Sequence, residues 1–168
     1  MKTIEHIVIV GFGSIAQALM PLLVDRYNCT ITIFEKNIDL TKEKIAKEFS
    51  ASIIKKNITP KNFEATIAPC LNGKAFLLNL AVSVSSEALI RLAQQHDSLY
   101  LDTCIEPWEY LGSGDSSLIS NFYLRERIKK FGAEIKSGCS TAIIAHGANP
   151  GFISVLLKKS AGKYGRDK

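Results

Sequence analysis

Short apolar runs alternate with amphipathic stretches along the chain. Ile7–Val10 and Ala75–Val82 are apolar at nearly every position, which is typical of parallel strands buried beneath helices on both faces. Thr30–Phe34, Ser52–Ile58 and Leu99–Cys104 predict three further strands by composition. The pattern therefore predicts a sheet whose strands are separated by longer polar-faced segments.

Helical patterns fill the intervals between these strands. We expect helices over residues 14–27, 39–49, 59–73, 85–96 and 117–131. Asp39 or Thr41 is expected to cap the second helix, Thr59 before Pro60 the third, and Ser85 the fourth. Short strands are expected at residues 133–136 and 142–145, and a tight turn at 146–151 then opens a final helix at 152–159.

Side-chain spacing also predicts which faces of the helices are buried. In the second helix Leu40, Ile45 and Phe49 are expected on the inner side, and in the fourth Leu89, Leu92 and Ala93. Pro21 lies inside the first helix and should bend it. Strands alternating with helices predict an α/β fold with a doubly wound parallel sheet.

A glycine motif follows the first strand directly. Gly11, Phe12, Gly13, Ser14, Ile15 and Ala16 read G-x-G-x-x-A between a strand and a helix, the context that a dinucleotide-binding turn requires. The first glycine permits the tight turn, the second lets a pyrophosphate approach the backbone, and the alanine lets helix and strand pack closely. The motif makes the predicted sheet Rossmann-type, with a cofactor at the helix N-terminus.

Glu35 ends the second predicted strand, 24 residues after Gly11. An acid at this place accepts hydrogen bonds from the adenosine ribose hydroxyls and repels a 2′-phosphate. The spacing therefore favours NAD over NADP, and the neighbouring Lys36 leaves NADP open. The alternative is a tight strand-to-helix turn beside a solvated surface glutamate.

Composition and charge narrow the class of protein. The chain has 168 residues, 46% hydrophobic residues and a net charge of +5, which fits one ordinary globular domain. Its lysines alternate with acids or occur in pairs, so no nucleic-acid surface is expected. No apolar stretch is long enough for a membrane span, and Met1 to His6 lead straight into the first strand without a signal peptide.

The four cysteines are scattered singly at Cys29, Cys70, Cys104 and Cys139. Their spacing matches no zinc motif, so no metal site is expected. Isolated cysteines suit a reducing compartment, and we expect a cytoplasmic protein.

Three loops at strand ends carry the candidate chemistry, because ligands of such sheets bind outside the carboxyl ends of the strands. The loop from Asn79 through Ala81 to Ser83 is expected near the pyrophosphate and the nicotinamide ribose. The loop from Asp102 and Thr103 to Glu109 is expected to face the nicotinamide, as is the turn from His146 to Gly151.

The most informative of these loops reads Glu106-Pro107-Trp108-Glu109. Carboxylates beside an aromatic ring suit a substrate that bears amines, and one glutamate could act as a general base. The alternative is a surface loop in which Trp108 seals the edge of the core.

The turn His146-Gly-Ala-Asn149-Pro-Gly151 is the third candidate. Asn149 could hydrogen-bond an amine or a hydroxyl, and His146 could transfer protons near neutral pH. The alternative is that both are ordinary polar residues of a turn.

Taken together, three segments resemble the bacterial homospermidine synthases of the saccharopine dehydrogenase-like group. They are G-F-G-S-I-A at 11–16, Y-L-D-T-C-I-E-P-W at 100–108 and H-G-A-N-P-G at 146–151, in this order along the chain. The resemblance implies an enzyme with bound NAD that takes a hydride from putrescine, passes an aminobutyl group to a second putrescine and returns the hydride to the imine.

The same resemblance implies roles for single residues. Glu106 and Asn149 would contact the polyamine beside the nicotinamide, Glu35 would hold the ribose, and Asp102 and Thr103 would lie near the nicotinamide. It also implies a homodimer in the full-length form. Residues 1–151 would form the NAD-binding domain, and 152–168 would begin a helix leading to a substrate and dimerisation domain, so that the 168-residue chain alone is expected to be inactive.

Two other functions stay open from the sequence. One is a saccharopine or carboxynorspermidine dehydrogenase, which would accumulate reduced cofactor where a homospermidine synthase would not. The other is a nucleotide-sensing domain without catalysis, against which an exposed apolar surface at Phe152–Leu157 would speak.

Overall fold

The computed structural model describes residues 3–108, 121–134, 138–144 and 158–159. In this part of the chain six parallel strands form one sheet in the order β3-β2-β1-β4-β5-β6. The strands are β1 (His6–Val10), β2 (Thr30–Glu35), β3 (Ser52–Lys55), β4 (Ala75–Asn79), β5 (Leu99–Asp102) and β6 (Ala142–Ile143). The chain winds outward from β1 to β3, returns to β4 and continues to the other edge. The doubly wound Rossmann-type fold is therefore confirmed, with its switch point between β1 and β4.

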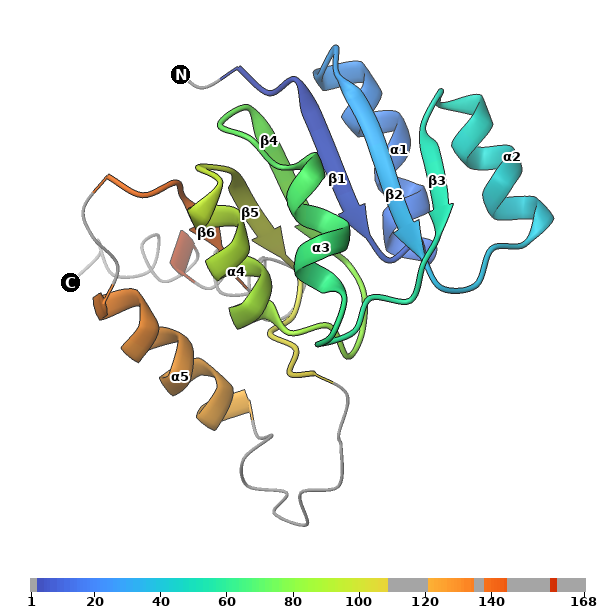
Figure 1. Cartoon of the computed structure of the whole chain (residues 1–168). Helices are drawn as coiled ribbons and strands as arrows, with labels where there is room; N and C mark the ends of the chain where they lie inside the picture. The colour runs from blue at the N-terminus through green and yellow to red at the C-terminus, as the bar shows by residue number, and fades with distance from the viewer. Residues whose placement is uncertain (1–2, 109–120, 135–137, 145–157, 160–168) are drawn as a thin grey trace.

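Helices cover both faces of this sheet. They are α1 (Ser14–Arg26), α2 (Leu40–Glu48), α3 (Phe63–Ile67) with a 3₁₀ turn η1 (Ala68–Cys70), α4 (Ser86–Gln95) and α5 (Asn121–Glu134). In Figure 1 α3 and α4 lie in front of the sheet and α1 lies behind it. None of the helices that the structure describes is both long and apolar enough to span a lipid bilayer.

Alternate residues of β1 point into two separate cores. Val8 and Val10 pack with residues of α3, α4 and α5 on one face, whereas Ile7 and Ile9 pack with residues of α1 and α2 on the other. All four side chains are at most 1% exposed. Burial on both faces explains why this strand is an unbroken apolar run, as a central parallel strand must be.

Several predicted boundaries are wrong, each for a local reason. Thr59 does not cap the third helix, because the Asn62 side chain accepts the Thr59 N–H at 2.8 Å and holds residues 59–62 in a turn. The helix begins only at Phe63. Strands β3, β4 and β5 end at Lys55, Asn79 and Asp102, so the residues that follow each of them are free to form the loops at the carboxyl edge.

Two further predictions are also wrong, one about the packing of Leu40 and one about a short strand after α5. Leu40 is 84% exposed, because five residues at 100° each place it about 140° around the helix from Ile45. The strand expected at residues 133–136 is wrong at its start, since Ala133 and Glu134 belong to α5; residues 135 and 136 lie outside the described part of the chain. The burial of Leu89, Leu92 and Ala93 in α4 is confirmed.

Candidate functional site

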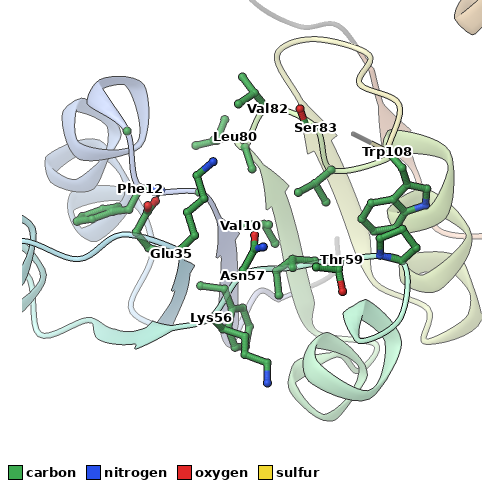
Figure 2. Close-up of a pocket in the computed structure, with 18 of the residues that line it drawn as sticks. Val10, Phe12, Glu35, Lys56, Asn57, Thr59, Leu80, Val82, Ser83 and Trp108 are labelled. Atoms are coloured by element: carbon green, nitrogen blue, oxygen red, sulfur yellow. Dashed lines mark hydrogen bonds between the residues drawn. The ribbon is translucent and has the colours of Figure 1, made fainter. Parts of the chain in front are cut away.

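A cavity of about 640 Å³ lies at the carboxyl edge of the sheet, where β1, β2 and β4 end. It is lined by residues 10–13, 34–36, 56–61 and 80–84 together with Lys42 and Trp108. Figure 2 shows Glu35 beside Phe12 at one end of the cavity and Trp108 at the other. This is the position at which doubly wound sheets bind ligands.

Gly11 is the first residue of the turn after β1, and this position requires glycine for two reasons. Its φ angle is +89°, which side-chain-bearing residues rarely adopt. A Cβ atom here would also lie 2.8 Å from the backbone N and Cα of Ala81. The loop after β1 and the loop after β4 therefore meet in direct backbone contact at Gly11.

Gly13 has a different role, because the space beside it is open. It is exposed and lines the cavity, and an added Cβ would meet no protein atom within 4 Å. It is the N-cap of α1, no side chain caps that helix end, and its first turn holds no acidic residue. The first N–H groups of α1 and the positive end of its dipole are thus the features that attract an anion such as a pyrophosphate, and its binding here stays a prediction.

The other residues of the glycine motif divide between surface and core. Ser14 and Ile15 are exposed in the first turn of α1, and Ile15 is 58% accessible. Ala16 is fully buried in the core between α1 and the sheet. Phe12 is also fully buried there, so its side chain anchors the turn.

Glu35 is tied to the glycine turn by its carboxylate. The Phe12 N–H donates to its Oε2 at 2.6 Å, and the Asn37 N–H donates to its Oε1 at 3.0 Å. The Lys42 ammonium lies 3.2 Å from Oε1. The acid and the turn that the sequence places 24 residues apart are therefore in direct contact.

The charge of Glu35 is secured by these partners. Burial acts to raise the pKa of this carboxyl, but the N–H groups of Asn37 and Phe12 and the positive charge of Lys42 outweigh it, so that the pKa lies below its ordinary value. Glu35 is thus an anionic acceptor at neutral pH. Together with the glycine turn and the bare end of α1, it fits an adenosine ribose followed by a pyrophosphate.

Asn79 shapes the cavity from behind and does not line it. It is 2% exposed, and its side-chain amide donates to the Val84 carbonyl at 3.1 Å and to Tyr100 Oη at 3.4 Å. Its Oδ1 accepts the Ala81 N–H at 3.4 Å. The amide thereby fixes the loop of residues 80–84, including Ala81, and all of this loop lines the cavity; a contact from Asn79 or Ala81 to the cofactor stays a prediction.

Asp102 is fully buried beside Asn79 in the sheet register. It accepts a hydrogen bond of 2.8 Å from Tyr100 Oη. Burial and the charge of Asp102 raise the pKa of Tyr100 well above its ordinary value, so the phenol stays a donor. Thr103 is half-buried, and neither residue lines the cavity, so their predicted place near the nicotinamide is untested by this geometry.

Glu106 joins the loops that follow β4 and β5. Its Oε2 accepts the N–H of Ser83 at 3.2 Å, where Ser83 adopts a positive φ of 62°. Its own N–H donates to Ser86 Oγ at 3.0 Å, and its carbonyl accepts the Ser86 N–H at 2.9 Å. The predicted substrate residue is thus half-buried beside the cavity and holds one of the loops that line it.

Trp108 both packs at the edge of the core and lines the cavity, as the two alternative interpretations of its loop expected. Its ring packs against Phe63 at 5.3 Å between centroids and 57° between planes, at the edge of the core. The same ring lines the cavity opposite Glu35. His146, Asn149 and Glu109, the remaining candidates, lie outside the residues that the structure describes, as does the segment 152–157.

Two parts of the cavity were not predicted from the sequence. Lys42 was overlooked, although the first turn of a helix after β2 must start near the end of that strand. Residues 56–61 follow β3 and reach the same edge for the same topological reason. Within the described ranges no cluster of potential metal ligands occurs.

Comparison with known proteins gives the sequences and folds that this chain resembles. Residues 7–143 match the family model of the saccharopine dehydrogenase NADP binding domain. Two curated relatives are homospermidine synthases, one from Mesorhizobium japonicum at 29% identity over 163 residues and one from Blastochloris viridis at 33% identity over 168 residues. Each alignment covers 92% of this chain but only 33% and 34% of the respective relative.

Solved structures agree with these sequence matches. The homospermidine synthase of Legionella pneumophila, solved in complex with NAD, is 32% identical with a TM-score of 0.78 over 98% of this chain and 35% of that one. Saccharopine dehydrogenase (L-Glu forming) of Saccharomyces cerevisiae shares the fold with a TM-score of 0.66 at 15% identity, covering 96% of this chain and 32% of that one. The chain thus spans about a third of the length of the relatives it matches.

Proposed function

The chain belongs to the saccharopine dehydrogenase NADP binding domain family, and from this premise we propose that it is the dinucleotide-binding part of a homospermidine synthase. The observation that carries the proposal is the cavity in which the glycine turn, Glu35 and Trp108 come together. Its support beyond the fold comes from the homospermidine synthases that align with 92% of the chain.

The proposed reaction has no net oxidation. A nicotinamide bound in the cavity would supply hydride chemistry, by taking up the hydride of an amine-bearing carbon and giving it back. Putrescine that has lost a hydride and a proton is an imine; the amine of a second putrescine adds to it and ammonia leaves. Return of the hydride and a proton to the new imine yields homospermidine.

The chain's own residues would serve this reaction by binding and orientation. Gly13 and the end of α1 would receive the pyrophosphate, and Glu35 the adenosine ribose. Glu106 would offer its carboxylate to an ammonium group of the diamine, and Asn149 a further hydrogen bond. A cavity shielded from water would protect an imine from hydrolysis.

The nucleotide step can be tested on the chain itself. Trp108 is the only tryptophan and lines the cavity, so its fluorescence should be quenched by energy transfer to bound NADH. Gly13→Val should weaken NADH binding at least tenfold, because the added side chain fills the open space at the anion site. Gly132→Val is the matched control, since Gly132 lies in α5 with the same open space around it.

The reaction can be tested by joining this chain to the remainder of a relative. In a chimera, the chain replaces the matching first third of the Legionella pneumophila enzyme. We expect it to convert putrescine to homospermidine without accumulation of NADH. Steady accumulation of reduced cofactor with an amino-acid substrate would instead favour the saccharopine dehydrogenase-like alternative, which the family match also allows.

A further inference from the structure

The acid that should select the cofactor is already paired with a lysine. Glu35 is 8% exposed, and the Lys42 ammonium lies 3.2 Å from its Oε1. Both side chains line the nucleotide cavity. An isolated carboxylate at this position would repel a 2′-phosphate, but a carboxylate in contact with an ammonium group has most of its charge offset.

Lys42 is held in this place by its own surroundings. Its N–H donates to the Asp39 side chain at 2.9 Å in the N-cap of α2, which fixes its backbone. Its ammonium also donates to the Asn37 carbonyl at 2.7 Å, and its side chain is only 17% exposed. Two contacts therefore favour one position of the ammonium, beside Glu35, from which a competing hydrogen-bond donor can still displace it.

Most of the charged residues that line the cavity are cations, like Lys42. Among the described residues that line the cavity, Glu35 is the one acid, whereas Lys36, Lys42, Lys56 and Lys61 are four cations. Lys36, Lys56 and Lys61 are exposed, so they can turn toward an anion at the mouth. The cavity as a whole therefore favours additional negative charge on its ligand.

We propose that Lys42 is a specificity-determining residue that lets this site accept adenosine with a 2′-phosphate as well as adenosine with a free 2′-hydroxyl. The inference deepens the proposed function, because it rests on dinucleotide binding in the same cavity. A 2′-phosphate placed near Glu35 Oε1 would lie within reach of the Lys42 ammonium, which would pair with it.

A ribose with a free 2′-hydroxyl is accommodated when it displaces one of the hydrogen-bond partners of Glu35. A carboxylate offers about four lone-pair positions, and three of those of Glu35 are used by Phe12, Asn37 and Lys42. A ribose that donates two hydrogen bonds must displace one of the three. Two are backbone N–H groups fixed by the fold, so Lys42, whose side chain can rotate, is the partner that gives way.

The test compares the dissociation constants of NADH and NADPH by energy transfer from Trp108. For the wild-type chain the two constants should agree within about tenfold. Lys42→Met keeps the apolar stem and should weaken NADPH at least tenfold while changing NADH by less than about threefold. Lys42→Arg should keep the wild-type ratio, and Lys44→Met, an exposed lysine of the same helix that does not line the cavity, should match the wild type.

Two results overturn the inference: a wild-type chain that prefers NADH by more than about a hundredfold, or an unchanged ratio in Lys42→Met. Thermal unfolding of each variant separates loss of fold from loss of specificity, and Lys42→Gln provides a second neutral substitution if Lys42→Met is unstable. Failure of the chimera to make homospermidine would leave this ratio untouched, so the two proposals fail independently.

Discussion

The glycine turn illustrates, at the scale of single residues, how one motif serves two purposes. Gly11 is required by the protein, because it has a positive φ and presses on the Ala81 backbone. Gly13 is required by the proposed ligand, because nothing in the protein fills the space beside it. A pattern read as one feature in the sequence therefore combines a folding constraint and a binding constraint.

Gly11→Ala should lower the free energy of unfolding by about 1–3 kcal/mol from the positive φ alone, and further through the contact with Ala81. Gly132→Ala in α5 should have the opposite sign and stabilise by roughly 0.5–1 kcal/mol, since alanine is preferred in a helix interior. Urea unfolding followed by circular dichroism measures both. Equal effects of the two substitutions would contradict this account of Gly11.

His6 gives the stability a specific pH dependence. Its Nε2 lies 2.9 Å from Thr32 Oγ1. Burial lowers its pKa below 6.5, and a hydrogen bond with the Cys70 backbone offsets only part of this shift. The unfolded chain therefore binds the proton more readily than the folded chain, and stability falls as the pH drops through 6.5 toward the folded value.

In urea titrations over this pH range, His6→Gln should flatten the decline in stability, because the substituted side chain carries no titrating group. His96→Gln, at the C-cap of α4, is the control and should retain the wild-type decline. If His6→Gln and the wild type lose stability in parallel, a different group titrates.

Residue spacing predicted part of the site, but not its internal contacts. The glycine motif and Glu35 could be located because a strand, a turn and the end of the next strand follow fixed local patterns. That Glu35 bonds to Phe12 and Lys42 depends on side-chain rotamers and on where α2 begins, which no spacing encodes. Likewise Asn79 and Asp102 were expected near the cofactor, yet both are buried in the protein.

Among the elements, the N-terminus of α4 contacts the loop that follows β5. Ser85 caps the helix by accepting the Ala88 N–H at 3.3 Å. Ser86, which is fully buried, accepts the Glu106 N–H through its hydroxyl. The helix end therefore sets the path of the chain that leaves β5.

Ser86→Ala should cost about 1–3 kcal/mol of unfolding free energy, because the N–H of Glu106 loses its acceptor in a half-buried place. Ser52→Ala is the control, since Ser52 is exposed at the start of β3 and should change stability by less than about 0.5 kcal/mol. Because Glu106 also holds Ser83, nucleotide affinity should fall in Ser86→Ala alone. An effect on stability without one on affinity would separate the Glu106 loop from the cavity.

The order of the elements was predictable from the sequence, whereas their ends were not. Apolar runs and amphipathic spacing identify strands and helices because burial on two faces or on one leaves different patterns. Boundaries depend on single hydrogen bonds, such as that of Asn62 with Thr59. Leu40 shows the same limit for packing, since an apolar side chain in a short helix need not face the core.

For the whole molecule, folding and nucleotide binding should be linked by mass action. NADH at a hundred times its dissociation constant should raise the free energy of unfolding by about 2.7 kcal/mol. Urea unfolding with and without NADH measures this shift, and Gly13→Val should reduce it to about 1.4 kcal/mol or less at the same NADH concentration. If the urea midpoint of the wild-type chain did not move at saturating NADH, NADH would bind the folded and unfolded chains equally well, or bind neither.

Phe12 links the packing of the core to the affinity for the cofactor. Its ring lies in the core with Ile9 and Met20, while its backbone N–H donates to Glu35. A truncation deep in that core, which touches no ligand, should therefore reduce cofactor affinity before it unfolds the chain. Conversely, a bound cofactor should offset the stability that core substitutions remove. The cofactor concentration in a cell would then determine which core substitutions the protein tolerates.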